Sequence, residues 1–298
     1  MAAVWKKPCW RLVFSTAVLV RSFHVCITTG VVSMLFFKDT ALRQQWLSGE
    51  YLVPCIYLAL VFLSLVLYAA VCSMDPGFVS LTDNRNAIRK GRPCVESDSE
   101  EDDSASATET SVMIESDIGI KPRVKLRNCG FCGIQQPIRA KHCELCGFCI
   151  HRFDHHCPWF ETCIGERNHR FFWIFLLVET SLVGWTVHLV WTAFVYEASW
   201  SSWMVSNGLY MVAMFVLVLG GTATFLLVAS HTYLIGINLT TWEFMSRHRI
   251  TYLKDYHGDE NPFDEGLLKN LWKFFLHLRL KDWEMHLMNR PAKTLGRA

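Results

Sequence analysis

The residues with the clearest chemical potential are seven cysteines that lie between positions 129 and 163. They read as Cys129-x2-Cys132, then His142-Cys143-x2-Cys146-x2-Cys149, then Asp154-His155-His156-Cys157 and Cys163. CxxC pairs with nearby histidines have the spacing of structural zinc sites, which take four cysteine or histidine ligands in a tetrahedron. The cluster therefore predicts two zinc sites and leaves one cysteine and one histidine over.

The residues left over can do covalent chemistry. Asp154, His155 and Cys157 supply an orienting carboxylate, a base and a nucleophile. The pKa of a free thiol is about 8.5, and a neighbouring imidazolium lowers it, whereas zinc ties up the charge of a bound thiolate. The alternative is that Cys157 and His155 are two further zinc ligands, and spacing alone leaves that alternative open.

The elements that must position these residues include four long apolar segments. The chain of 298 residues is 51% hydrophobic and 19% charged, and a segment of about 20 apolar residues crosses the hydrocarbon of a bilayer. We therefore predict an α-helical integral membrane protein. Arg21 and His24 interrupt the first segment, which lacks a small-residue cleavage site and is interpreted as a retained anchor. The predicted spans are residues 12–37, 51–73, 171–196 and 208–237.

Lysine and arginine positions predict the orientation of the spans. The loop of residues 38–50 contains only Lys38 and Arg43, and the loop of residues 197–207 contains neither lysine nor arginine, so both loops are predicted to be lumenal. Residues 1–11, 74–170 and 238–298 hold all the others except Arg21, and we predict them to be cytosolic. A reducing compartment favours metal ligation over disulfides in the cysteine cluster.

The polar segments differ in composition. Within residues 74–126, a stretch at about 94–117 is acidic and poor in large apolar groups, so we expect it to be disordered. Ser97 and Ser99 suggest phosphorylation there, although a solvated linker is the simpler interpretation. Residues 127–170 are too few for a hydrophobic core and need metal to fold. We find no internal repeat. The net charge of +2 and the absence of a basic stripe give no indication of nucleic-acid binding.

The segment 266–288 interleaves apolar and basic residues. This pattern is typical of a helix lying on a membrane surface, and it fits equally well a helix packed against the cysteine-rich segment.

Asp154-His155-His156-Cys157-Pro158-Trp159 within this cysteine frame resembles the DHHC family of protein S-acyltransferases, or palmitoyltransferases. Asp75-Pro76-Gly77 resembles the DPG motif of the family, and Thr240-Thr241-Trp242-Glu243 resembles its TTxE motif. Residues 261–263 and Asn270 resemble its carboxyl-terminal region. These elements follow the family order over nearly the whole chain, and residues 38–43 and 240–250 are most similar to a short vertebrate member.

The resemblance implies a fold, ligands and roles. It implies four transmembrane helices with a small two-zinc cytosolic domain, residues 127–170, between spans two and three. One zinc would be held by Cys129, Cys132, His142 and Cys149, and the other by Cys143, Cys146, His156 and Cys163. Asp154 would orient His155, and His155 would activate Cys157. Thr241 and Glu243 would brace this region.

The activity implied is transfer of a long-chain acyl group from palmitoyl-CoA to cysteines of membrane-associated proteins, through an acyl-Cys157 intermediate. The protein would reside in Golgi or endoplasmic reticulum membranes, with both termini and the active site cytosolic. Trp159 would lie near the mouth of an acyl-chain cavity between the spans. We expect CoA phosphates to meet Arg139, Lys141, Arg152, Arg167 and Arg170, although anionic lipid headgroups would attract the same charges.

Three other functions use similar residues. A RING-type ubiquitin ligase would end in a further CxxC, and here the last cysteines are single. A thiol oxidoreductase using Cys129-x2-Cys132 would place that motif in a βαβ unit. A zinc scaffold without catalysis would bind the same metal but would not accept an acyl group on Cys157.

Overall fold

The computed structural model describes residues 16–80, 109–110, 126–253, 256, 260–276 and 283. These residues fall into two compact units, named here by their content. The helical unit takes the described residues of Met1–Ser73, Pro158–Glu161 and Phe171–Thr232. The cysteine-rich unit takes those of Met74–Cys157, Thr162–Arg170 and Tyr233–Ala298.

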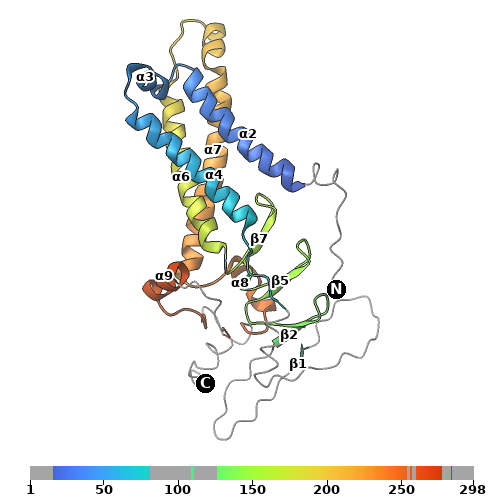
Figure 1. The fold of residues 1–298 in the computed structure, drawn as a ribbon. Helices are drawn as coiled ribbons and strands as arrows, with labels where there is room; N and C mark the ends of the chain where they lie inside the picture. Colours follow the sequence, from blue (N-terminus) through green and yellow to red (C-terminus); the bar gives the residue numbers. More distant parts are fainter. Residues whose placement is uncertain are drawn as a thin grey trace. The chain divides into compact units, whose positions relative to one another are not determined.

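Within the described residues, four helices are long and apolar enough to cross a membrane (Figure 1). The predicted fold of a multi-pass membrane protein, with a cysteine-rich region between the second and third spans, is therefore confirmed. The buried faces of these helices share one apolar core that includes Tyr57, Val190 and Leu217. The helices are α2 (Thr16–Phe37), α4 (Leu52–Ser73), α6 (His169–Thr192) and α7 (Trp200–Gly236).

Hydrogen bonds between polar side chains join α4 and α6 inside the helical unit. The Tyr57 hydroxyl of α4 lies 2.9 Å from the Thr186 hydroxyl of α6. The Ser64 hydroxyl of α4 donates a hydrogen bond to the Glu179 carboxylate of α6. These bonds satisfy side chains that would otherwise be unpaired in an apolar environment.

Both predicted lumenal loops contain helix. Helix α3 (Ala41–Ser48) begins after Thr40, whose hydroxyl accepts a hydrogen bond from the Arg43 amide at 3.3 Å, and ends at Gly49, with φ of 85°. Helix α7 begins at Trp200, although the loop was predicted to extend to residue 207. Three serines and Asn207 lower the hydropathy of its first turns, so hydropathy alone placed the helix start too late.

Three β-hairpins form the centre of the cysteine-rich unit. They pair β2 (Leu126–Cys129) with β3 (Ile134–Gln136), β4 (Lys141–Cys143) with β5 (Phe148–Ile150), and β6 (His155–Cys157) with β7 (Thr162–Ile164). Strand β1 (Glu109–Thr110) pairs with β2, so these two residues of the stretch predicted to be disordered form a strand. The rest of residues 94–117, including Ser97 and Ser99, lies outside the described residues.

Segments that precede and follow the hairpins in the sequence complete this unit. The Asp75 carboxylate accepts hydrogen bonds from the Gly77 and Phe78 amides, at 2.8 and 2.9 Å, and closes a turn. The His151 amide then donates to the Gly77 carbonyl at 2.8 Å, which ties that turn to the second hairpin. The carboxyl-terminal part contributes α8 (Thr241–Ser246), the 3-10 helix η1 (Arg247–Arg249) and α9 (Leu267–Leu276).

Candidate active site and metal centres

The three hairpins are successive copies of one pattern. Cys129, Cys143 and Cys157 follow each other at a spacing of 14 residues and occupy the same register, opposite Ile134, Phe148 and Thr162. The copies are RNCGFCGIQQPIRA at 127–140, KHCELCGFCIHRFD at 141–154 and HHCPWFETCIGERN at 155–168. Our expectation of no internal repeat was therefore wrong. The second cysteine of the CxxC and the glycine after it change in the third copy, which hides the repeat.

Strand geometry explains why neighbouring residues serve different clusters. Successive side chains of a strand point to opposite faces. In β4, His142 therefore points away from Cys143, and in β6, His156 points away from His155 and Cys157. The histidine in the second position of the second and third hairpins thus groups with the CxxC of the hairpin before it.

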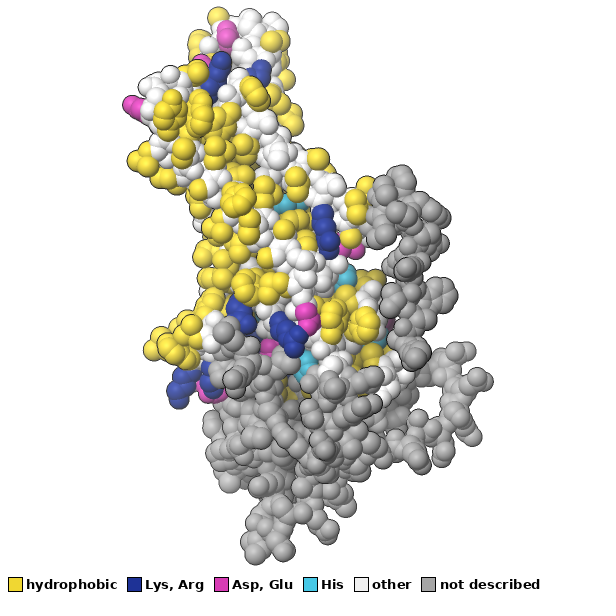
Figure 2. Space-filling view, viewed as in Figure 1, with side chains coloured by type: hydrophobic (Ala, Val, Ile, Leu, Met, Phe, Trp, Pro, Cys, Tyr) yellow, Lys and Arg dark blue, Asp and Glu magenta, His cyan; other side chains and the backbone are white. Residues whose placement is uncertain are grey.

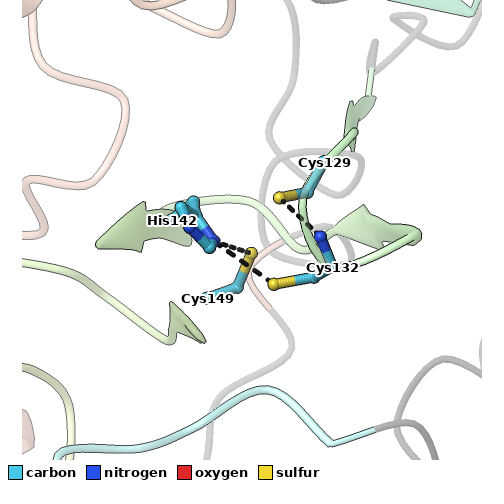
Figure 3. A group of neighbouring side chains, drawn as sticks. All are labelled: Cys129, Cys132, His142 and Cys149. Atoms are coloured by element: carbon cyan, nitrogen blue, oxygen red, sulfur yellow. Dashed lines mark hydrogen bonds between the residues drawn. The ribbon is translucent and has the colours of Figure 1, made fainter. Parts of the chain in front are cut away.

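The first cluster brings together Cys129, Cys132, His142 and Cys149, whose ligand atoms all lie within 4.8 Å of one another (Figure 3). The Cys132 sulfur lies 3.2 Å from His142 Nδ1, and the Cys149 sulfur lies 4.0 Å from it. The Gly133 amide donates to the Cys129 carbonyl at 2.8 Å, and Gly133 has φ of 62°, a conformation that favours glycine.

The second cluster brings together Cys143, Cys146, His156 and Cys163, again within 4.8 Å. His156 Nδ1 lies 3.6, 3.4 and 3.7 Å from the sulfurs of Cys143, Cys146 and Cys163. A tetrahedral zinc with Zn–S of about 2.3 Å and Zn–N of about 2.0 Å separates its ligand atoms by about 3.5–3.8 Å. Both clusters are therefore compatible with zinc.

Burial and the neighbouring sulfurs disfavour the thiolate form of the cluster cysteines, and a bound cation would favour that form. Burial, followed by the neighbouring sulfurs, raises the pKa of the Cys163 thiol far above its usual value. Burial also raises the pKa of Cys149, although a hydrogen bond from Gln136 opposes the increase. All ten cysteines that the structure describes are free thiols, so no disulfide takes the place of metal among them.

Cys157 belongs to neither cluster and lies beside His155 and Asp154. The Asp154 carboxylate, 1% exposed, lies 2.6 Å from His155 Nδ1. Burial lowers the pKa of His155, but hydrogen bonds with Asp154 and Cys157 outweigh burial and raise this pKa to about 9. Because His155 and Cys157 lie on the same face of β6, the imidazole and the thiol can exchange a proton.

The TTxE segment holds Asp154 in place. The Thr241 amide, at the start of α8, donates to the second carboxylate oxygen of Asp154 at 2.8 Å. Thr240 caps the same helix by accepting from the Glu243 amide, and Glu243 accepts from the Thr240 amide at 2.9 Å, which completes a capping box. The motif therefore fixes both the helix start and the Asp154 carboxylate.

Arg139 forms a buried ion pair with Glu243 of this motif. Its guanidinium is 0% exposed, donates to Glu243 at 2.7 Å, and lies between the rings of Phe263 and Trp283, at 4.1 and 4.3 Å from their centroids. The expectation that Arg139 faces CoA is therefore wrong. It is also wrong for Arg152, which is 7% exposed and donates to Asn238 at 3.2 Å. Both side chains form buried hydrogen bonds inside the unit instead.

The other residues expected at CoA have different surroundings. Arg167 pairs with Asp75, and Arg170 donates to the Phe275 carbonyl at 3.4 Å. Lys141 lies over the rings of Phe153 and Trp242, 5.2 and 5.3 Å from their centroids. Trp159 belongs to the helical unit and is 60% exposed.

A pocket of about 410 Å³ opens in the cysteine-rich unit, and sequence reasoning missed most of its residues. Its lining includes the cations Arg127, Lys141 and Arg249 and the rings of Phe131 and Tyr252, and no acidic side chain among the described residues. Lys141 was expected at CoA from the sequence, and a signal for Arg127 was present, because Arg127 and Lys141 hold equivalent positions in the 14-residue repeat. Arg249 belongs to the basic run Arg247-His248-Arg249 after the TTxE segment, and this run is the sequence signal for its charge.

The thiol oxidoreductase alternative does not fit this geometry. A redox-active CxxC opens a helix, whereas Cys132 lies in the turn of a hairpin and strand β3 follows it. The first CxxC lies in the turn of a hairpin, which is the geometry of a metal knuckle.

Comparison with known proteins gives the same answer as the geometry. The family model described as DHHC palmitoyltransferase matches residues 123–248. Palmitoyltransferase ZDHHC12-A of Danio rerio is 41% identical over 282 residues, which are 94% of this chain and 98% of the relative. Palmitoyltransferase ZDHHC12 of Homo sapiens is 39% identical over 275 residues (92% and 93%), and that of Mus musculus is 38% identical over 270 residues (91% and 92%).

The short vertebrate member that residues 38–43 and 240–250 resembled is the one numbered twelve, so this finer resemblance is confirmed. The chain covers nearly the full length of these relatives. The chain belongs to the DHHC palmitoyltransferase family and is a protein S-palmitoyltransferase.

Proposed function

We propose that Cys157 carries the acyl group, with His155 as proton carrier and Asp154 as the residue that orients His155. The observation behind this assignment is the 2.6 Å bond from Asp154 to His155 beside a cysteine that belongs to neither metal cluster. A carboxylate on one imidazole nitrogen leaves the other nitrogen available for the thiol.

The transfer has two steps. In the first, His155 takes the Cys157 proton, the sulfur attacks the acyl carbon of palmitoyl-CoA, and the bond from that carbon to the CoA sulfur breaks. His155 gives its proton to the departing CoA sulfur. In the second, a substrate cysteine gives its proton to His155 and attacks the same carbon, and Cys157 leaves as a thiolate. Each step exchanges one thioester for another, so no redox reagent is needed.

Two structural zinc ions are part of the proposal. One would be held by Cys129, Cys132, His142 and Cys149, and the other by Cys143, Cys146, His156 and Cys163. Zinc would join each hairpin to the next and supply folding free energy to hairpins whose strands have only three or four residues. In the proposed reaction every proton is transferred to or from His155, and the zinc ions take no part in proton transfer.

The pocket lined by Arg127, Lys141 and Arg249 is the place we propose for the phosphates of CoA. Two residues of its lining lie close to Asp154. Lys141 lies over the ring of Phe153, which precedes Asp154. Trp242 follows Thr241, whose amide donates to Asp154. Anionic lipid headgroups are the alternative source of the same charge. Arg249→Ala is expected to raise KM for palmitoyl-CoA, and the alternative predicts no change in KM at fixed lipid composition.

The lysine and arginine distribution supports a cytosolic position for both termini and for Cys157. Golgi or endoplasmic reticulum membranes are the proposed location, and membrane-associated proteins with accessible cysteines are the proposed substrates. An acyl chain gains about 0.8 kcal/mol for each CH₂ removed from water, which favours an acyl-chain cavity between the spans with Trp159 near its mouth.

The experiment incubates the purified protein with labelled palmitoyl-CoA and measures both the label and the zinc content. Cys157→Ser is expected to keep its zinc and to lose the hydroxylamine-sensitive label. Cys163→Ser is expected to lose zinc together with the label. Retention of the label by Cys157→Ser, or loss of its zinc, would favour the scaffold without catalysis.

A further inference from the structure

The 14-residue repeat places the nucleophile at a metal-ligand position. Each CxxC is completed by the histidine and the cysteine of the next hairpin, so Cys129 and Cys132 join His142 and Cys149. By the same rule, Cys157 begins a third set. The second member of that set is Phe160 instead of cysteine, and the positions that a fourth hairpin would supply, Arg170 and Leu177, lie in helix α6.

The backbone of the third hairpin keeps the knuckle shape. Gly133 and Gly147 end the first two CxxC turns with φ of 62° and 73°, and Glu161 takes the equivalent position with φ of 52°. An L side chain rarely adopts this conformation, which glycine adopts freely. The third turn therefore retains the geometry of a metal knuckle although its residues have changed.

Contacts with residues of the helical unit hold this third turn, where a metal ion would hold the first two. Residues Pro158–Glu161 belong to the helical unit, where Phe160 is 3% exposed and packs against Tyr68 and Phe175, with ring centroids 5.0 and 5.3 Å away. The Arg21 guanidinium donates to the Phe160 carbonyl at 3.0 Å, and the Tyr68 hydroxyl donates to the Trp159 carbonyl at 2.8 Å. The turn is thus fixed without a ligand.

We propose that the third hairpin is a zinc knuckle without metal, in which Phe160 keeps Cys157 free to react. Phe160 does this in two ways: it removes the second thiolate, and it anchors the turn in the aromatic cluster of the helical unit. The proposal rests on the assignment of Cys157 as nucleophile, and it makes Phe160 a positioning residue.

The test is Phe160→Cys against Phe160→Ser, two side chains of similar size that lose the same aromatic contacts. Cysteine at position 160 would give Cys157 a CxxC partner, and His155 lies on the same strand face, so three zinc ligands would be present. We expect the Phe160→Cys protein to bind more zinc than wild type, and its labelling by palmitoyl-CoA to fall on adding zinc and recover with a mild chelator. Phe160→Ser should show neither change.

Two results would overturn the proposal. One is equal zinc content and equal zinc response in the cysteine and serine variants. The other needs no variant: reversible inhibition of wild-type labelling by zinc, at concentrations that saturate Phe160→Cys, would mean that Phe160 does not protect Cys157. Zinc content does not depend on acyl transfer, so failure of this proposal can be told from failure of Cys157 as the nucleophile.

Helix α9 carries a second, independent inference. Its inner face is fixed to the ends of two spanning helices: Asn270 donates to the carbonyl of Gly236, the last residue of α7, at 2.8 Å. Phe274 packs against His169, the first residue of α6, with ring centroids 5.2 Å apart. Because both residues end membrane spans, α9 is held where those spans leave the hydrocarbon.

The outer face of α9 is apolar. Leu268, Trp272 and Leu276 recur every four residues and are 82%, 68% and 56% exposed. Apolar side chains gather over α9 with charged ones beside them (Figure 2), and Lys269 flanks the stripe. Leucine and tryptophan beside lysine are typical of a helix at a membrane interface.

The geometry points to the lipid surface as the partner of this face, with Trp272 at headgroup depth. The test compares tryptophan fluorescence of full-length wild type and Trp272→Phe in bilayer nanodiscs with brominated lipids. We expect the part of the emission that Trp272→Phe removes to be quenched most by lipids brominated near the headgroup. The part removed by Trp283→Phe, which changes a side chain only 6% exposed, should be insensitive.

An unquenched Trp272 component would overturn the lipid assignment. If the protein were also a dimer that Leu268→Glu dissociates, the face would be an interface between two copies.

Discussion

The cysteine-rich unit and the helical unit achieve order by opposite means. In the cysteine-rich unit, strands of three or four residues are joined by two Cys₃His clusters, a capping box and the buried pair Arg139–Glu243. In the helical unit, helices of at least 22 residues share a broad apolar core, with a few hydrogen bonds such as that between Tyr57 and Thr186. The hairpins of the first unit depend on individual ligand and hydrogen-bonding atoms, beside an apolar cluster that includes Leu253 and Phe263. The helices of the second unit depend on many apolar contacts.

The difference teaches where chemistry can be placed. A ligand set or a buried ion pair fixes its neighbours within tenths of an ångström, which proton transfer from Cys157 to His155 requires. An apolar core tolerates substitution at constant volume. Single substitutions are therefore expected to change zinc content and acyl transfer more in the first unit than in the second.

The largest effect is expected from Cys143→Ser. This change removes one ligand of the second cluster, and structural zinc contributes about 10–16 kcal/mol to folding in small domains. We expect loss of one zinc per chain and of all acyl transfer, measured by metal analysis and palmitoyl-CoA labelling. The matched change in the helical unit is Leu182→Ala, a buried core position that should cost about 2–5 kcal/mol and leave zinc unchanged. Loss of zinc from Leu182→Ala would break the comparison.

The next effect is expected from Arg139→Ala. The substitution leaves the Glu243 carboxylate buried and unpaired, which costs about 3–5 kcal/mol. A lower unfolding temperature and slower labelling should follow, because Glu243 also caps the helix that holds Asp154. Restoring shape without charge in the double variant Arg139→Met and Glu243→Gln should recover part of the stability. No recovery would mean that the charges themselves are needed.

His155→Lys separates charge from proton transfer. Lys141 occupies the equivalent position of the second hairpin, so lysine is compatible with the strand. We expect both zinc ions to be retained and labelling to fall about 10²–10⁴-fold, the usual contribution of a positioned acid–base group. His155→Ala is the control without charge. Near-normal labelling in His155→Lys would show that a positive charge alone activates Cys157.

The smallest effect is expected from Tyr57→Phe in the helical unit. One hydrogen bond to Thr186 is lost, with a cost of about 1 kcal/mol. Thermal unfolding should shift slightly, and the initial rate of labelling should match wild type. A loss of activity comparable with that of Arg139→Ala would contradict the contrast between the two units.

What the sequence predicted well follows from the same contrast. Spacing predicted two zinc sites between Cys129 and Cys163, and the resemblance to the family supplied the two ligand sets that the structure brings together. The start of α7 was misplaced by eight residues, because hydropathy cannot separate a capped polar turn from a loop. Glu179 bonds to Ser64 across two helices, a pairing with no signal in either segment.

The charged residues were predicted least well. Arg139 and Arg152 were placed at CoA because they lie near the cysteines in sequence, yet both are buried against residues about a hundred positions away, near Asn238 and Glu243. Long-range pairing of this kind is decided by the fold, so proximity in sequence could not reveal it. The 14-residue repeat was visible in principle, and the strand register made it plain.

The central claim is that Cys157 is the cysteine that carries the acyl group. The most direct measurement is peptide mass spectrometry of the full-length protein after a short incubation with palmitoyl-CoA, with and without hydroxylamine. We predict a hydroxylamine-sensitive acyl group on the peptide that contains Cys157, and none on the cluster cysteines. An acyl group on Cys26, Cys55 or Cys72, with Cys157 unmodified, would contradict the account.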